Sequence, residues 1–166
     1  MKNQTPIKRH PAVISFSRDH HFGLLLGWKI RQGLNKAVNP ERISNYVLYF
    51  FDNELEKHFT EEEALLFSQL PAANELRQRA EKDHAGLRQL IGAIRENKQN
   101  KTALLQLADD LDKHIRFEER ELFGYLQNNL TEKALEAAGS RSANNSQAID
   151  DQWQDVFWDT KQRSGL

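Results

Sequence analysis

Two thirteen-residue segments of this chain follow almost the same pattern, and both are typical of helices. They are HFTEEEALLFSQL from His58 and HIRFEERELFGYL from His114, each with Glu at +4 and +5, Leu-Phe at +8 and +9 and Leu at +12. Residues four apart project from one side of a helix, so each histidine shares a face with its +4 glutamate. Leucines flank both pairs at helical spacing. Each pair is therefore expected on or beside a buried stripe, where a carboxylate is costly unless it is paired or binds a metal.

Apolar residues recur at helical spacing from about residue 17 to residue 128 and predict four long helices. The first is expected to begin at Ser15 or Ser17, which can act as an N-cap, and to end before Asn39-Pro40. The others are expected over about residues 41–70, 72–97 and 102–128. Four long helices with short connections predict an all-α fold, an antiparallel up-down-up-down four-helix bundle.

The C-terminal part of the chain differs in composition. The segment TEKALEAAG predicts a short fifth helix with its N-cap at Thr131 and its C-cap at Gly139. The stretch SRSANNSQ is typical of a flexible linker, and Trp153, Phe157 and Trp158 would share one face of a final helix. We expect a bundle over residues 1–139, followed over 140–166 by a linker and an aromatic tail. The tail is expected to pack on the bundle or on a partner, such as a second copy of the chain.

Composition narrows the possible functions. The 166 residues suit one domain, and the absence of cysteine leaves only nitrogen and oxygen ligands for any metal. A net charge of −1 gives no bias toward nucleic acid or membrane lipid. The apolar part of the N-terminus is too short for a signal peptide, and no run approaches the roughly 20 apolar residues of a membrane span. The expectation is a cytoplasmic protein with no nucleic-acid or membrane partner.

Each expected helix carries one histidine that helical spacing places inward. In the first helix His20 is preferred over His21, which shares a line with Leu25 and Trp28. The predicted inward stripe there is Ser17, His20, Leu24, Gly27, Ile30 and Leu34, with Gly27 leaving room near the site. The candidate metal ligands of the whole chain are His20, His58, Glu62, His84, His114 and Glu118. Imidazole and carboxylate without sulfur suit iron, manganese or zinc, and bridging carboxylates favour two metals.

Four segments, SRDHH, HFTEEEALLF, EKDHAGL and HIRFEERELF, together resemble the hemerythrin family, specifically the bacterial HHE cation-binding domains. The resemblance covers about residues 10–130. It implies a four-helix bundle around a non-haem di-iron centre, with the six candidates as ligands and with Glu62 and Glu118 bridging the irons. It also implies an oxygen-side pocket at Leu111 and Ile115.

The chain departs from the oxygen carriers of that family at two places. They have His-x3-His on the third helix, whereas here Ala80 stands four residues before His84. One iron would then be under-coordinated and open to water or to Glu81, although Glu81 also fits a solvated charge on the helix flank. The carriers place the fourth-helix carboxylate at +5 as Asp, whereas here +4 and +5, Glu118 and Glu119, are both Glu.

The residues and the resemblance together predict a metal-binding protein. It is expected to bind or sense oxygen, a related small ligand such as nitric oxide or peroxide, or iron itself. The alternative is an oxidase, peroxidase or ferroxidase that uses the same ligands. The sequence shows no nucleophile motif and no substrate pocket with its own acid–base residues, so a binding or sensing role is favoured over an enzymatic one. Glu63 and Glu119 are interpreted first as exposed helix charges, with groups that support the ligands or an iron entry path as the alternatives.

Overall fold

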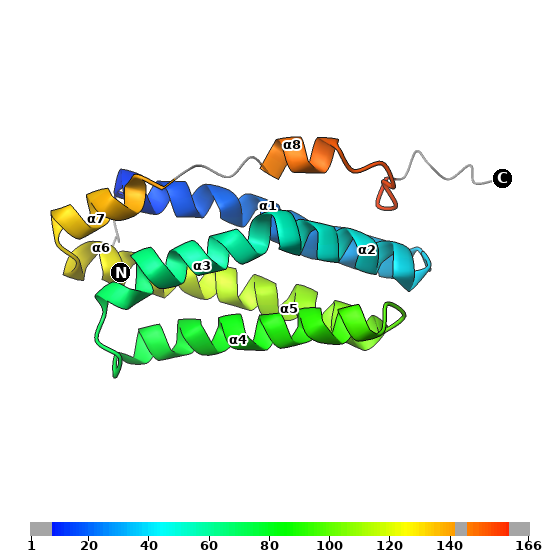
Figure 1. Ribbon diagram of the computed structural model, residues 1–166, viewed down its shortest axis with the longest axis horizontal. Helices are drawn as coiled ribbons and strands as arrows, with labels where there is room; N and C mark the ends of the chain where they lie inside the picture. The colour runs from blue at the N-terminus through cyan, green and yellow to red at the C-terminus, as the bar shows by residue number, and fades with distance from the viewer. Residues whose placement is uncertain (1–7, 142–145, 160–166) are drawn as a thin grey trace, which may run out of the picture.

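The computed structural model describes residues 8–141 and 146–159, and within these ranges all regular structure is helical (Figure 1). The helices are α1 (Pro11–Asn35), α2 (Pro40–Phe50), α3 (Glu56–Leu65), α4 (Glu75–Glu96), α5 (Lys101–Phe117), α6 (Phe123–Asn129), α7 (Glu132–Gly139) and α8 (Ser146–Asp151). The π-helical segments η1 (Phe51–Leu55) and η3 (Glu118–Leu122) join α2 to α3 and α5 to α6, and the 3-10 turn η2 (Phe67–Gln69) follows α3. None of the described helices is long and apolar enough to cross a membrane.

Four antiparallel legs make the bundle, which confirms the predicted fold class. They are α1, α2–η1–α3, α4 and α5–η3–α6, and they alternate in direction along the chain (Figure 1). The first leg packs on the second and the fourth, and the third leg also packs on both of these. The order around the bundle therefore follows the order along the chain, as short connections require.

The first helix begins earlier than predicted. It starts at Pro11, and the His10 side chain accepts a hydrogen bond from the backbone N–H of Ala12 through Nδ1 at 3.1 Å. The prediction of Ser15 or Ser17 as N-cap is wrong because a proline at the first helical position, with a side-chain cap before it, already starts the helix.

Later helix ends follow the sequence more closely. Side-chain caps start α2, α4, α5 and α7, at Asn39, Asn74, Asn100 and Thr131. Gly139 is not the C-cap of α7 as predicted, since the helix includes it and Ser140 caps the end. A Cβ at Gly139 would lie 3.2 Å from Cβ of Ala12, so the glycine allows α7 to pack closely on α1.

The inward face of α1 is rotated slightly from the predicted stripe. Leu24 is 40 % exposed, whereas Gly23, Leu26 and Ile30 are buried. A Cβ at Gly23 would lie 2.8 Å from Cδ1 of Ile115. The missing side chain at Gly23 therefore lets α1 approach α5, and this contact turns Leu24 outward.

The aromatic tail packs on its own bundle, but not as a helical face. Since α8 ends at Asp151, the prediction that Trp153, Phe157 and Trp158 share one helical face is wrong. Phe157 is buried in the core, and the ring of Trp158 lies 4.8 Å from that of Tyr46 between centroids. Residues 142–145, in the middle of the predicted linker, lie outside the described residues.

A buried ion pair anchors α8 to the bundle and gives a first prediction. Lys29 Nζ is buried and donates to Asp150 Oδ2 at 2.9 Å and to the Tyr46 hydroxyl at 3.0 Å. Asp150→Ala leaves the ammonium without its counter-charge and should lower the free energy of unfolding by about 3 kcal/mol in urea denaturation. The control, Asp151→Ala, removes the exposed neighbouring carboxylate. Equal losses in the two variants would contradict a specific role for the Lys29 ion pair.

Candidate metal centre

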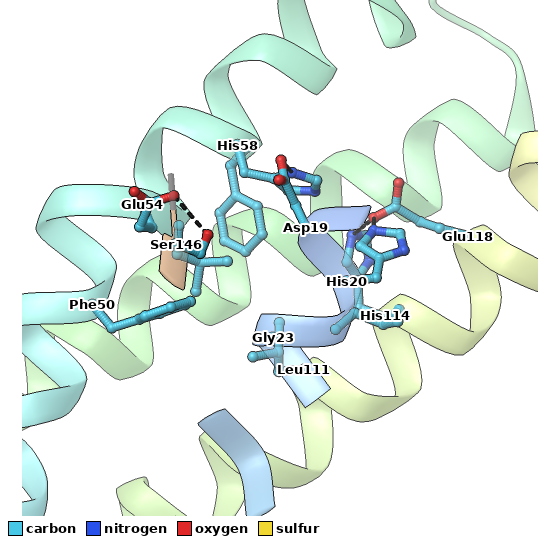
Figure 2. A pocket seen from close by; sticks show the side chains of 13 residues that line it. Asp19, His20, Gly23, Phe50, Glu54, His58, Leu111, His114, Glu118 and Ser146 are labelled. Carbon is cyan, nitrogen blue, oxygen red and sulfur yellow. Dashed lines mark hydrogen bonds and ion pairs between the residues drawn. The ribbon is translucent and has the colours of Figure 1, made fainter. Parts of the chain in front are cut away.

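A buried polar cluster lies between two apolar ones in the middle of the bundle. Each leg passes from one apolar cluster to the other at its histidine, and the polar side chains that meet there are at most 4 % exposed. These side chains are His20, His58, Glu62, His84, His114 and Glu118, the six candidates of the sequence analysis. Figure 2 shows His20, His114 and Glu118 gathered at this point, with His58 nearby.

The six side chains form two groups of four that share both glutamates. One group contains His20 and His58, the other His84 and His114, and each adds Glu62 and Glu118. Within each group one ligand atom from every residue lies within 4.8 Å of the others. Two metal positions, each with two imidazoles and both bound by the same two carboxylates, fit this arrangement.

The carboxylates of the two shared glutamates are buried and would be stabilised by nearby positive charge. Glu62 and Glu118 are fully buried, and none of their four oxygens accepts a hydrogen bond of acceptable geometry from a described residue. His58 Nε2 lies 3.1 Å from Glu62 Oε1, and His114 Nε2 lies 2.5 Å from Glu118 Oε1. Buried carboxylate oxygens without hydrogen bonds are costly unless a cation binds them, so the donor set fits a pair of metal ions.

A second set of carboxylates fixes the four histidines. The Nδ1 atoms of His20, His58, His84 and His114 bond to Glu119, Asp19, Glu63 and Asp83 at 2.6, 2.8, 2.7 and 2.9 Å. Each carboxylate belongs to the leg beside that of its histidine. The bonds therefore run around the bundle as a closed ring, from the first leg to the second, third and fourth and back to the first.

This ring selects the tautomer that a metal needs. Since a carboxylate only accepts, Nδ1 of each histidine is the donor, and the neutral ring then presents an unprotonated Nε2 to the cluster. Hydrogen bonds of this kind orient metal-binding imidazoles and raise their basicity. Arginines neutralise three of the four carboxylates, because Arg9, Arg88 and Arg141 lie 3.0, 2.7 and 2.6 Å from Glu119, Glu63 and Asp19.

The surrounding carboxylates give the cluster a high affinity for positive charge. Burial alone would lower the pKa of His58, but the charge of Glu62 and the hydrogen bond with Asp19 raise it to about 10. The pKa of His114 is likewise raised to about 10, because Glu118 and Asp83 outweigh its burial. Protons and metal ions therefore compete for the same nitrogen atoms.

Sequence reasoning found only part of this outer ring. Glu63 and Glu119, for which exposed helix charge was the preferred interpretation, each bond to a histidine of a neighbouring leg. Asp19 and Asp83 were missed. The signal was present, since each leg carries a carboxylate next to a candidate ligand, in the dipeptides Asp19-His20, Glu62-Glu63, Asp83-His84 and Glu118-Glu119.

Two further ligand candidates lie outside the cluster. His21 is exposed, with its ring against Phe22. The Glu81 side chain is 45 % exposed and pairs with Arg77 at 2.7 Å, as a charge on the helix flank does. In the fourth leg, the glutamate at +4, Glu118, lies in the cluster, whereas the glutamate at +5, Glu119, bonds to His20.

The two candidate metal positions have the same number of donors, so the donor count does not support the expected difference in coordination between them. The two groups contain the same four donor types, two histidines and two shared glutamates. Ala80 is fully buried in the apolar cluster that contains Phe67 and Phe117. One under-coordinated metal, expected because Ala80 stands where the oxygen carriers have a histidine, stays a prediction that the equal donor sets do not support.

A cavity adjoins the group formed by His20 and His58. The cavity is small, with a volume of about 20 Å³, and Gly23 and Leu111 line it (Figure 2) together with Ile115. The glycine expected to leave room near the site was Gly27, but Gly23 occupies that position. The cavity wall is mostly apolar, so a ligand inside would be shielded from bulk water.

The outer ring gives a second prediction. Asp83→Ala removes the acceptor that orients His114 and should weaken metal affinity roughly 10–100-fold, measured by competition with a chelator. The control is Asp110→Ala, since Asp110 accepts a hydrogen bond from Gln106 on the outside of α5. Unchanged affinity in Asp83→Ala would show that the ring does not support the ligands.

Comparison with known proteins agrees with this geometry. The family model described as Hemerythrin HHE cation binding domain matches residues 18–126, a range that includes all six cluster residues. No curated protein and no solved structure matches the chain.

Proposed function

Since the chain belongs to the hemerythrin HHE cation-binding domain family, we propose that its metal site is a non-haem di-iron centre that binds or senses a small ligand. Oxygen is the first candidate for that ligand, and nitric oxide and peroxide are chemically related ones. The observation that carries the proposal is the pair of four-residue groups sharing Glu62 and Glu118. Manganese and zinc accept the same donors, so the choice of iron rests on the family.

The protein residues have separable roles in this proposal. His20 and His58 would hold one metal, His84 and His114 the other, and the two glutamates would hold both. A pair of ferrous ions supplies electrons and open coordination positions to a small ligand. The carboxylate ring keeps each Nε2 directed inward, while the apolar residues Leu111 and Ile115 shield the cavity from water.

Two phenylalanine rings stack on two of the proposed histidine ligands. The ring of Phe59 lies 4.0 Å from that of His84, at 20° between planes, and Phe123 stacks on His20 at 5.3 Å and 7°. These contacts limit rotation of the imidazoles about their side-chain bonds. A rigid donor set lowers the ordering cost of binding two metals.

Absorption spectroscopy tests the proposal directly. Protein loaded anaerobically with ferrous iron and then exposed to air should develop near-ultraviolet and visible charge-transfer bands, which azide should shift. Zinc-loaded protein is the matched control and should stay colourless. Iron-loaded protein without such bands would contradict a di-iron centre, even if iron is bound.

A further inference from the structure

One ionisable side chain in the cavity wall has no part in the proposed metal site. Glu54 lies in η1, and its residue is only 6 % exposed. It lines the cavity on the side opposite His20, His114 and Glu118 (Figure 2). Phe50 and Ser146 lie beside it in the cavity wall (Figure 2). A buried carboxyl group is costly, and the fold retains this one beside the space where a ligand would lie.

The C-terminal segment supplies the one side-chain hydrogen bond that Glu54 makes within residues 8–141 and 146–159. Ser146, the first residue of α8, is itself buried and donates from Oγ to Glu54 Oε2 at 2.9 Å. Among the described residues Oε1 has no hydrogen-bond partner, and Oε2 is the oxygen on the Ser146 side of the cavity (Figure 2). Tyr49 and Lys29 hold the same short helix in place, through the carbonyl of Ile149 and the carboxylate of Asp150.

The surroundings of Glu54 raise its pKa and so shift it toward its neutral, hydrogen-bond-donating form. Burial raises its pKa, and the negative charges of Asp19 and Asp150 raise it further. The hydrogen bond from Ser146 and the positive charge of Lys57 act in the opposite direction, but the net shift is upward. A neutral carboxyl group can donate one hydrogen bond from one oxygen while the other accepts.

We propose that Glu54, held by Ser146, is a ligand-binding residue that donates a hydrogen bond to a small ligand in the cavity. This inference rests on the proposed function and specifies the ligand class. That class comprises small, linear or diatomic molecules whose outer end carries negative charge or accepts a hydrogen bond. A purely apolar gas would gain nothing from Glu54. The C-terminal segment then completes the ligand site, because Ser146 comes from α8.

Azide, a small linear anion, is the probe. With the iron-loaded protein, Glu54→Leu should weaken azide binding about tenfold, and Glu54→Gln, which keeps an N–H donor, should stay within about threefold of the unchanged protein. Ser146→Ala should give an intermediate loss, since it leaves the carboxyl group in place but free to rotate. Asp52→Leu is the matched control, because Asp52 lies on the same turn with its side chain 49 % exposed.

Two further measurements separate the possible outcomes. Metal content should be the same in all four variants. The metal-free protein should show an infrared carbonyl band of a protonated carboxyl group that disappears in Glu54→Gln. If Glu54→Leu binds azide as tightly as the unchanged protein at full metal content, or if the band is absent, Glu54 only fixes α8 to the bundle and the inference is wrong. A chain that takes up no metal contradicts the proposed function and the inference with it.

Discussion

Glu62→Ala and Glu118→Ala are each expected to lose most of both metal ions, whereas His20→Ala should keep close to one. The reason is geometric, because each glutamate belongs to both four-residue groups and each histidine to only one. Removing a bridging carboxylate leaves two cations with less charge compensation and each with one donor fewer. Elemental analysis of the purified, iron-reconstituted variants measures the effect.

Neighbouring glutamates provide the controls for this prediction. Glu81→Ala should keep both metals, since Glu81 pairs with Arg77 at the surface. Glu63→Ala should keep metal at saturation but bind it more weakly, because Glu63 reaches His84 rather than the metal positions. A Glu62→Ala protein that still holds one firmly bound ion would refute the assignment of Glu62 as a bridge.

Metal binding should raise the thermal stability of the fold by about 10 °C. At a free metal concentration about 1,000 times the dissociation constant, linkage adds about 4 kcal/mol, and for a chain of this length each kcal/mol shifts the midpoint by roughly 2–4 °C. The unfolded chain lacks the converged donors, so the metal stabilises the native state selectively. Melting curves with and without a strong chelator measure this difference.

The variant Glu118→Leu is the control for the melting experiment. It fills the same buried position with an apolar side chain and removes one shared ligand of both groups. Its melting temperature should not respond to iron or to chelator. Identical curves for the unchanged protein with and without bound metal would mean that the cluster stabilises the fold by itself.

Helical periodicity was enough to predict the bundle and to place the inner ligands. Histidines four residues before a glutamate, on faces that also carry leucines, had to turn inward if the helices packed at all. The family resemblance then implied the bridging role of Glu62 and Glu118. That resemblance did not depend on how the helices pack. The ligation itself remains a prediction, supported by the convergence of these six side chains.

The outer carboxylates depended on how neighbouring helices pack, which periodicity does not specify. Asp19 and Asp83 lie one residue before a ligand, so helix geometry turns them by about 100° toward a flank. On a flank a carboxylate faces either solvent or the next helix, and only the packing of that helix decides between them. Here Asp19 meets His58 and Asp83 meets His114.

The sequence pattern also did not predict the local deviations from regular α-helix. The legs expected as single helices contain the π-helical segments η1 and η3, which carry Glu54 and Glu118. Such segments are frequent at functional sites and add one residue to a turn, but they have no simple sequence signature. The end of α8 at Asp151 was missed for a similar reason, because contacts of Trp158 and Phe157 with the bundle override a helical pattern.

The number of metal ions per chain tests the central claim most directly. Protein reconstituted anaerobically with ferrous iron, freed of excess metal and analysed for iron and protein should contain close to two ions per chain, one for each group of four donors. Native mass spectrometry should show both ions in the same molecule. A ratio near one would contradict the paired site, and a ratio near zero would contradict the metal centre altogether.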